Sequence, residues 1–289
     1  VGSSFPELST TVISTLIHGK FDLGVSAIVG SAIFNILVIP GVSVIMAGKL
    51  DSDKLLIYKD AQFYITSVAV LLLTFSMAVI YHPEPGENIK GAVTRPIAMI
   101  PVLLYLLYLY LQMQEMRDYK KKQKEEQKME AIWKEWLKLI GSLVLIVASV
   151  EGLVRSAIFM GDYFNTPDFL WGVTVVAAAT SVPDAIVSIR VAINKKGVVS
   201  LSNVLGSNVF DLLIAVPAGI LIAGSSVVDF SVAAPLMLFL TFATILLLTL
   251  LRRNLKLKIT EGWILVLFYV VFIAWMVLES FGILTWLIE

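Results

Sequence analysis

Acidic and hydroxyl side chains interrupt apolar sequence twice within a short part of the chain. Residues 180–184 read Thr-Ser-Val-Pro-Asp, and residues 207–211 read Ser-Asn-Val-Phe-Asp. In both motifs a hydroxyl residue precedes the aspartate by four positions, a spacing that places the two side chains on one face of a helix. Oxygen ligands without nitrogen or sulfur suit Ca²⁺ and alkali ions rather than zinc or copper. The two motifs therefore predict a site for a hard cation.

A second copy of both motifs stands at the start of the chain. Residues 2–7 read Gly-Ser-Ser-Phe-Pro-Glu, and residues 30–35 read Gly-Ser-Ala-Ile-Phe-Asn. The first of these matches residues 179–184 in its serine, proline and acid, and the second matches residues 206–211 in Gly-Ser and Phe but ends in Asn instead of Asp. Here too a hydroxyl residue precedes the acid or amide by four positions. We infer an internal repeat.

Composition places these motifs in a membrane protein. The chain has 289 residues and is 58% hydrophobic, against about 45–50% in soluble proteins. The long apolar runs predict helices, because lipid requires internally satisfied backbone groups and the runs are too continuous for barrel strands. We therefore expect an all-α polytopic membrane protein. The nine apolar segments are residues 1–17, 23–47, 61–81, 93–113, 136–160, 169–193, 198–224, 230–251 and 262–287.

Cysteine is absent and histidine occurs twice, which excludes disulfides and thiol chemistry and argues against a zinc site. Lysine and arginine gather at one end of the helices. The basic loops are residues 49–59, 112–138, 195–196 and 252–258, whereas the other end carries Lys20, Lys90 and Arg95. By the positive-inside rule the basic loops are cytoplasmic. The two motif copies then enter the membrane from opposite sides, as in an inverted repeat whose site lies near the midplane.

Glu7, Asp184 and Asp211 are the acids of these motifs. An acid at the centre of a membrane helix costs about 2.5–3.5 kcal/mol on insertion scales, so such residues are usually functional. Three converging carboxylates repel one another unless a cation or protons neutralise them. We predict a bound cation. The alternative is that the acids are buried, protonated and only hydrogen-bonded.

At these residues the chain resembles the cation/Ca²⁺ exchanger superfamily, whose two alpha repeats carry a GTS-x-PE-type motif and a later G-S-N-type motif. It is most similar to the potassium-dependent sodium/calcium exchangers, which pair Pro-Glu with Pro-Asp and carry Ser-Asn-x-Phe-Asp. The resemblance implies two inverted repeats of five helices, with the first helix expected before Val1. Residues 1–113 would then hold helices 2–5, residues 114–135 a cytoplasmic linker, and residues 136–289 helices 6–10.

The resemblance also implies an antiporter that exchanges Na⁺ for Ca²⁺, with or without K⁺, by alternating access in a plasma or cell inner membrane. Its partners would be these ions and the lipid bilayer, with no cofactor, no nucleic acid and no enzymatic step. Glu7 and Asp184 would hold Ca²⁺ in one state and Na⁺ in another, and Asp211 would determine the use of K⁺. The remaining implied site residues are Ser3, Ser4, Ser31, Asn35, Thr180, Ser181, Ser207 and Asn208.

Two other functions compete with this interpretation. A Ca²⁺/H⁺ exchanger of the same superfamily usually carries a Gly-Asn-x-x-Glu pattern, which the sequence lacks. An intramembrane aspartyl protease using Asp184 and Asp211 would need Tyr-Asp and Gly-x-Gly-Asp motifs, which are also absent, and it would leave Glu7 and the repeat unexplained.

Two charged residues lie four positions apart in segment 136–160, namely Glu151 and Arg155. We expect them to neutralise each other on one helix face. The alternative, a role in gating, follows from the resemblance, because this helix slides over the core in the family. His18 is expected in a solvated turn.

Overall fold

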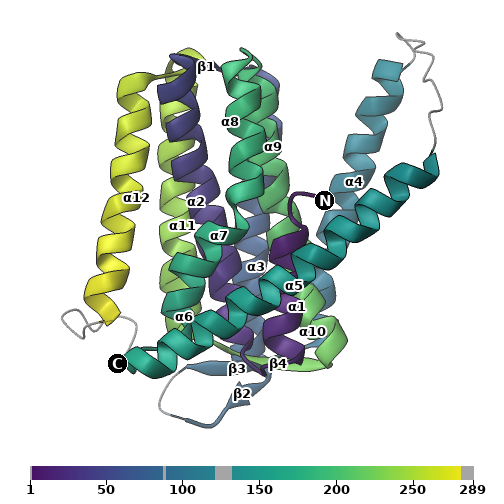
Figure 1. The fold of residues 1–289 in the computed structure, drawn as a ribbon, viewed down its shortest axis with the longest axis vertical. Helices are drawn as coiled ribbons and strands as arrows, with labels where there is room; N and C mark the ends of the chain where they lie inside the picture. Colours follow the sequence, from purple (N-terminus) through teal and green to yellow (C-terminus); the bar gives the residue numbers. More distant parts are fainter. Residues whose placement is uncertain (1, 87–88, 121–131, 281–289) are drawn as a thin grey trace.

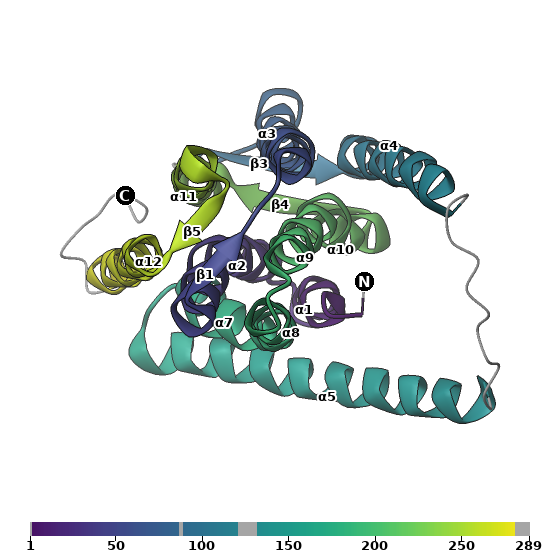
Figure 2. The ribbon, with the colours of Figure 1, turned by 90° about the horizontal axis from the view of Figure 1, so that it is seen from above.

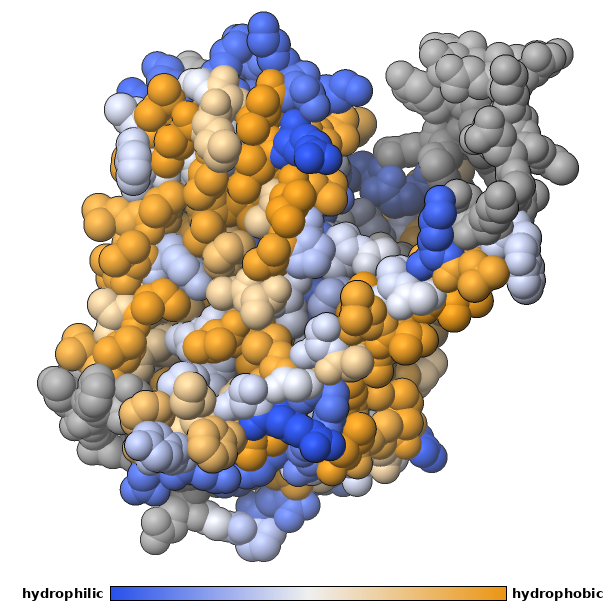
Figure 3. All heavy atoms as spheres, in the orientation of Figure 1, coloured by the Kyte–Doolittle hydropathy of each residue, from blue (hydrophilic) through white to orange (hydrophobic). Residues whose placement is uncertain are grey.

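The computed structural model describes residues 2–86, 89–120 and 132–280. In these ranges seven helices are long and apolar enough to cross a membrane, and a pair bent by 45° makes an eighth candidate span. A shorter helix, Phe5–Leu16, stands near the start of the chain, and each of the nine predicted segments contains helix in its described part. Figure 3 shows hydrophobic side chains over most of one face, between two hydrophilic ends. The prediction of a helical membrane protein is confirmed.

The elements before residue 121 are α1 (Phe5–Leu16), α2 (Phe21–Ala47), β1 (Lys49–Asp51), the π-helical segment η1 (Leu56–Asp60), α3 (Ala61–Tyr81), β2 (Pro83–Glu84), β3 (Lys90–Thr94) and α4 (Arg95–Lys120). Those after residue 131 begin with α5 (Ile132–Phe164), α6 (Asp168–Trp171), the π-helical segment η2 (Gly172–Val176), α7 (Ala177–Thr180), α8 (Val182–Ile193) and α9 (Gly197–Phe210). They continue with the π-helical segment η3 (Asp211–Ala215), α10 (Val216–Ala223), β4 (Ser225–Asp229), α11 (Phe230–Asn254), β5 (Lys256–Lys258) and α12 (Ile259–Ser280). Most of the predicted linker, residues 121–131, lies outside the described ranges.

Helix α2 lies at the centre of the bundle and packs against α1, α8, η2, α11 and α12 (Figure 2). Nearly all of its residues are apolar or small, which is the composition of a helix that is buried all round. Helix α5 instead runs obliquely along the outside of the bundle (Figures 1 and 2). It contacts the core through a small cluster that includes Val150, Val154 and Ala157. The bundle thus has a buried centre and one long, sparsely attached peripheral helix.

Five short strands, which the sequence did not predict, tie the helix ends together. Strand β1 follows α2 and pairs antiparallel with β5, which lies between α11 and α12. Strand β4 follows α10 and pairs antiparallel with β3, which lies between α3 and α4. Gly48 and Gly224, with φ of +82° and +97°, turn the chain from α2 into β1 and from α10 into β4, a backbone conformation that glycine adopts without steric cost.

The two strand pairings are reciprocal, and they lie at opposite ends of the molecule (Figure 1). Helix α1 runs from the middle of the molecule toward the end with β4, whereas α8 runs from the middle toward the end with β1. Equivalent helices therefore point in opposite directions. The fold is an inverted repeat, as the distribution of lysine and arginine predicted.

Candidate cation site

The first motif of the second copy lies where the span formed by α6, α7 and α8 breaks. Helix α7 ends at Thr180 and α8 begins at Val182, with a bend of 45° between them. Pro183 stands in the first turn of α8, where its missing N–H removes no helical hydrogen bond. Asp184 follows directly. The proline therefore fixes the break, and the break places an acid at the start of a helix inside the bundle.

The first copy has the same local geometry. Ser4 precedes α1 with φ −88° and ψ 7°, and Ser181 precedes α8 with φ −77° and ψ −7°. Pro6 occupies the first turn of α1, and Glu7 follows it. The repeat inferred from sequence is therefore also a repeat of backbone conformation.

Glu7, Asp184 and Asp211 come together in the middle of the bundle. Each offers a carboxylate oxygen, and these three oxygens lie within 4.8 Å of one another. Their side chains are buried. None of the three forms an ion pair with a basic side chain in the described part of the chain. Buried carboxylates this close together are unfavourable unless they are neutralised, and a bound cation would neutralise them.

Hydrogen bonds connect the two copies around these acids. The Ser31 hydroxyl donates a hydrogen bond of 3.3 Å to Glu7 Oε1. Ser31 Oγ also lies 2.7 Å from Ser181 Oγ. Asn35 Nδ2 donates to Asp184 Oδ2 at 3.4 Å. The second motif of the first copy thus contacts the first motif of the second copy.

Several buried oxygens of the site have no hydrogen-bond partner among the described residues. They are Ser4 Oγ, Glu7 Oε2, Asn35 Oδ1, Asp184 Oδ1 and both carboxylate oxygens of Asp211. A buried polar atom without a hydrogen-bond partner destabilises the folded state by about 1–3 kcal/mol, and a charged group does so by more. Carboxylate, amide and hydroxyl oxygens are the ligands preferred by Ca²⁺ and other hard cations. The donor set therefore fits the predicted class of ion.

The remaining predicted residues divide into two groups. Ser3 and Ser207 lie beside the Asp184 carboxyl, and Thr180 lies beside Glu7 while its hydroxyl also bonds the carbonyl of its own helix. Asn208 instead lies behind Asn35, to whose Nδ2 its Oδ1 accepts a hydrogen bond of 2.9 Å. The structure thus brings the predicted residues together around the three acids, and Asn35 separates Asn208 from Asp184.

Sequence reasoning missed one polar neighbour of this network, Tyr64 of α3. Its hydroxyl lies 3.3 Å from Asn208 Nδ2 as an acceptor. Tyr64 is fully buried and belongs to neither motif. The same helix also carries Thr66, Ser67, Thr74 and Ser76, so the sequence held no signal that singled out Tyr64.

Two inverted halves whose broken helices surround buried carboxylates form the architecture that is typical of secondary transporters. The sequence profile of the sodium/calcium exchanger protein family matches residues 1–114 and 134–278. The chain belongs to this family.

Two curated relatives illustrate the similarity. The sodium/calcium exchanger MaX1 of Methanosarcina acetivorans is 29% identical over 143 residues, which are 49% of this chain and 40% of that protein. The human sodium/potassium/calcium exchanger 5 is 40% identical over 83 residues, which are 28% of this chain and 17% of that protein. The chain therefore spans less than half the length of these relatives.

Solved structures share the fold. The sodium-calcium exchanger NCX_Mj, soaked with Na⁺ and Sr²⁺, superposes with a TM-score of 0.63 at 21% identity, covering 94% of this chain and 83% of that one. The H⁺/Ca²⁺ exchanger CAX superposes with a TM-score of 0.65 at 17% identity, covering 98% and 76%. Exchangers coupled to Na⁺ and to H⁺ thus have this architecture.

Proposed function

We propose that the protein is an antiporter that moves Ca²⁺ in exchange for Na⁺, with K⁺ as a further transported ion. The observation that carries the proposal is the cluster of three buried carboxylates, whose nearest oxygens lie within 4.8 Å of one another. Two carboxylates match the charge of Ca²⁺, and the third, from Asp211, matches one K⁺. A relative named as a sodium/potassium/calcium exchanger supports the choice of ions.

Alternating access would present this cluster to each side of the membrane in turn. We propose that the end of the molecule with β1 and β5 is cytoplasmic, because the basic loops 49–59 and 252–258 meet there and basic loops favour the cytoplasmic side. The membrane would be a plasma membrane or a cell inner membrane. We also propose that transport needs neither a resident cofactor nor an enzymatic step, since oxygen ligands are sufficient to bind these ions.

A second candidate is Ca²⁺/H⁺ exchange, which the fold of CAX favours. Carboxylates at close range can exchange a cation for protons as well as for Na⁺. The two functions differ in the driving ion, so one transport assay separates them.

The test is uptake of ⁴⁵Ca²⁺ by the full-length protein in vesicles, under an imposed Na⁺ gradient or an imposed pH gradient. We expect uptake driven by Na⁺ and increased by K⁺. Asp184→Asn should abolish it, whereas Glu84→Gln, an exposed acid on β2, should not. Uptake driven by the pH gradient alone would establish Ca²⁺/H⁺ exchange, and full activity of Asp184→Asn would contradict the site.

A further inference from the structure

A chain of buried side chains leads from the outer helices to the carboxylate cluster. Asn35 of α2 contacts Asp184, Asn208 of α9 contacts Asn35, and Tyr64 of α3 contacts Asn208. The exposed fraction of each of these four side chains is 0%. In a buried network every donor has to face an acceptor, so the direction of each amide can be deduced from its neighbours.

The direction of Asn208 is set by a backbone carbonyl. Its Nδ2 lies 3.2 Å from the carbonyl oxygen of Ala32 and 3.3 Å from the hydroxyl oxygen of Tyr64. The carbonyl can only accept, so the amide nitrogen of Asn208 must point toward it. Asn208 Oδ1 then points the other way, toward Asn35.

The direction of Asn35 follows from that of Asn208. Asn35 Nδ2 donates to Asn208 Oδ1 at 2.9 Å and to Asp184 Oδ2 at 3.4 Å, which uses both of its protons. A reversed Asn35 would place its own oxygen against two acceptors. Its Oδ1 is therefore the end left over, and it is one of the buried oxygens of the site without a hydrogen-bond partner in the described part of the chain.

Tyr64 completes the deduction because its hydroxyl is held as an acceptor. The Thr244 side chain of α11 lies beside the Tyr64 hydroxyl, and Thr244 Oγ1 donates its own proton to the Leu240 carbonyl at 2.7 Å. Thr244 can then only accept from Tyr64, which leaves a lone pair of the Tyr64 hydroxyl for Asn208. Tyr64 thus adds a second acceptor on α3 that reinforces the direction set for Asn208 by the Ala32 carbonyl.

We propose that Tyr64 is a positioning residue for the cation site: through Asn208 it keeps the side-chain oxygen of Asn35 available as a ligand. The inference rests on the proposed function, because it assumes that the carboxylate cluster binds Ca²⁺. Tyr64 touches no cation itself. Its effect is on affinity, through the orientation of Asn35.

The test is equilibrium binding of ⁴⁵Ca²⁺ to the purified full-length protein. Tyr64→Phe removes the hydroxyl and keeps the ring, and we expect Kd to rise by about three- to tenfold, the effect of one buried hydrogen bond. Thr244→Val should also raise Kd, whereas Thr244→Ser, which keeps a hydroxyl, should leave Kd at the wild-type value. Tyr269→Phe is the matched control, because this half-buried ring packs on Phe34 away from Asn208.

A second arm separates positioning from core packing. If Tyr64 acts through Asn35, then Tyr64→Phe should have no further effect on Kd in an Asn35→Ala background. An unchanged Kd in Tyr64→Phe, or equal effects with and without Asn35, would overturn the proposal. Failure of the wild-type protein to bind Ca²⁺ while folded would instead overturn the proposed function, so the two failures are distinguishable.

Discussion

The hydroxyl oxygens of Ser31 and Ser181 lie 2.7 Å apart although the residues are 150 positions apart in the chain. Each hydroxyl has one proton, and each has a second acceptor available. Ser31 can donate to Glu7, and Ser181 can donate to the Ala177 carbonyl at 2.8 Å. When Ser31 donates to Glu7, Ser181 is free to donate to Ser31. The direction of the hydrogen bond between the repeats therefore depends on whether Ser31 donates to Glu7.

Removal of either hydroxyl should weaken Ca²⁺ binding. We expect Ser31→Ala and Ser181→Ala each to raise Kd about three- to tenfold, and the double variant to raise it by less than the product because the two share one hydrogen bond. Equilibrium binding of ⁴⁵Ca²⁺ measures this coupling. Ser67→Ala is the control, since that hydroxyl bonds the Phe63 carbonyl of its own helix. Strictly multiplicative effects would contradict the coupling.

Helix periodicity made it possible to predict which side chains of each motif share a helix face, and the inverted repeat predicted that the two copies converge. A hydroxyl four positions before an acid shares its helix face, and this places Ser31 near Asn35 and Ser207 near Asp211. The same periodicity explains why Asn208 lies behind Asn35: it adjoins Ser207, and successive side chains on a helix diverge by about 100°. The motif drew attention to Asn208, but only the packing of α2 against α9 shows what it contacts.

Tyr64 and the short strands could not be predicted from the sequence. Tyr64 follows no spacing rule, because its partners come from other helices. The reciprocal strands are three to five residues long, too short for an alternating pattern to stand out. The inverted orientation, in contrast, was predictable from the one-sided placement of Lys and Arg, since that asymmetry reflects membrane insertion rather than packing.

Asp211 should determine the dependence of exchange on K⁺. Both of its carboxylate oxygens are buried and have no hydrogen-bond partner in the described ranges, so Asp211→Asn removes one negative charge with little change in shape. The two remaining carboxylates still match Ca²⁺. We expect Na⁺-driven ⁴⁵Ca²⁺ uptake to persist and to lose its stimulation by K⁺. An unchanged response to K⁺ would contradict the role of Asp211.

Gly30 should tolerate no larger residue, because α2 passes close to η2 and α7 at this position. A Cβ on Gly30 would collide with the Val173 carbonyl oxygen and the Ala177 side chain. We expect Gly30→Ala to destabilise the protein by about 1–3 kcal/mol, measured as loss of thermal stability in detergent. Gly141→Ala on α5 is the control, since a Cβ there meets nothing within 4 Å in the described structure. Equal stability of the two variants would contradict this packing.

His18 lies in a turn, as expected, but its side chain is not simply solvated, because its Nε2 lies 3.2 Å from Glu151 Oε2 of α5. Glu151 also pairs with Arg155, as predicted. Because α5 otherwise contacts the core through few apolar side chains, this polar contact should help to hold it. We therefore expect Glu151→Gln to loosen α5 from α1.

The chain has no cysteine, so the reactivity of one introduced cysteine can measure how tightly α5 packs against the bundle. Ala157 on α5 is only 3% exposed, and Ala157→Cys should react slowly with a maleimide. We expect Glu151→Gln to accelerate the reaction several-fold. Arg155→Gln, which leaves the contact between His18 and Glu151 intact, should have a smaller effect, and identical rates in both variants would argue against the contact.

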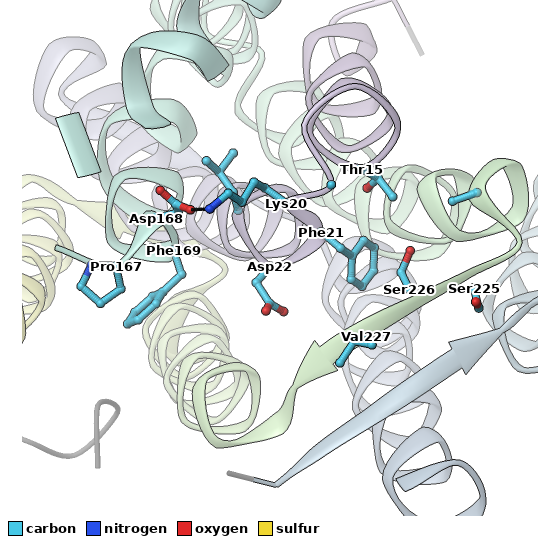
Figure 4. A pocket seen from close by; sticks show the side chains of 13 residues that line it. Thr15, Lys20, Phe21, Asp22, Pro167, Asp168, Phe169, Ser225, Ser226 and Val227 are labelled. Carbon is cyan, nitrogen blue, oxygen red and sulfur yellow. Dashed lines mark ion pairs between the residues drawn. The ribbon is translucent and has the colours of Figure 1, made fainter. Parts of the chain in front are cut away.

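A second polar bridge lies at the end of the molecule with β4. Lys20, in the turn between α1 and α2, pairs with Asp168 at the start of α6 at 2.6 Å, on the wall of a pocket of about 550 Å³ (Figure 4). The hydrogen bond to Asp168 and the charge of Asp168 raise the pKa of Lys20 above its ordinary value of 10.5. A cation with a raised pKa stabilises the folded state below its ordinary pKa, and this contribution disappears as the pH rises through the folded value.

Lys20→Met should therefore lower stability at neutral pH, and this loss should begin to diminish as the pH rises above 10.5. The loss should be at most about 1 kcal/mol, because solvent screens a partly exposed pair, and 1 M NaCl should reduce it. Thermal unfolding in detergent between pH 7 and pH 11 measures both trends, with Lys54→Met, an exposed lysine near the end with β1, as the control. A loss that is independent of both pH and salt would show that the methylene stem of Lys20, rather than its charge, joins α1 and α2 to α6.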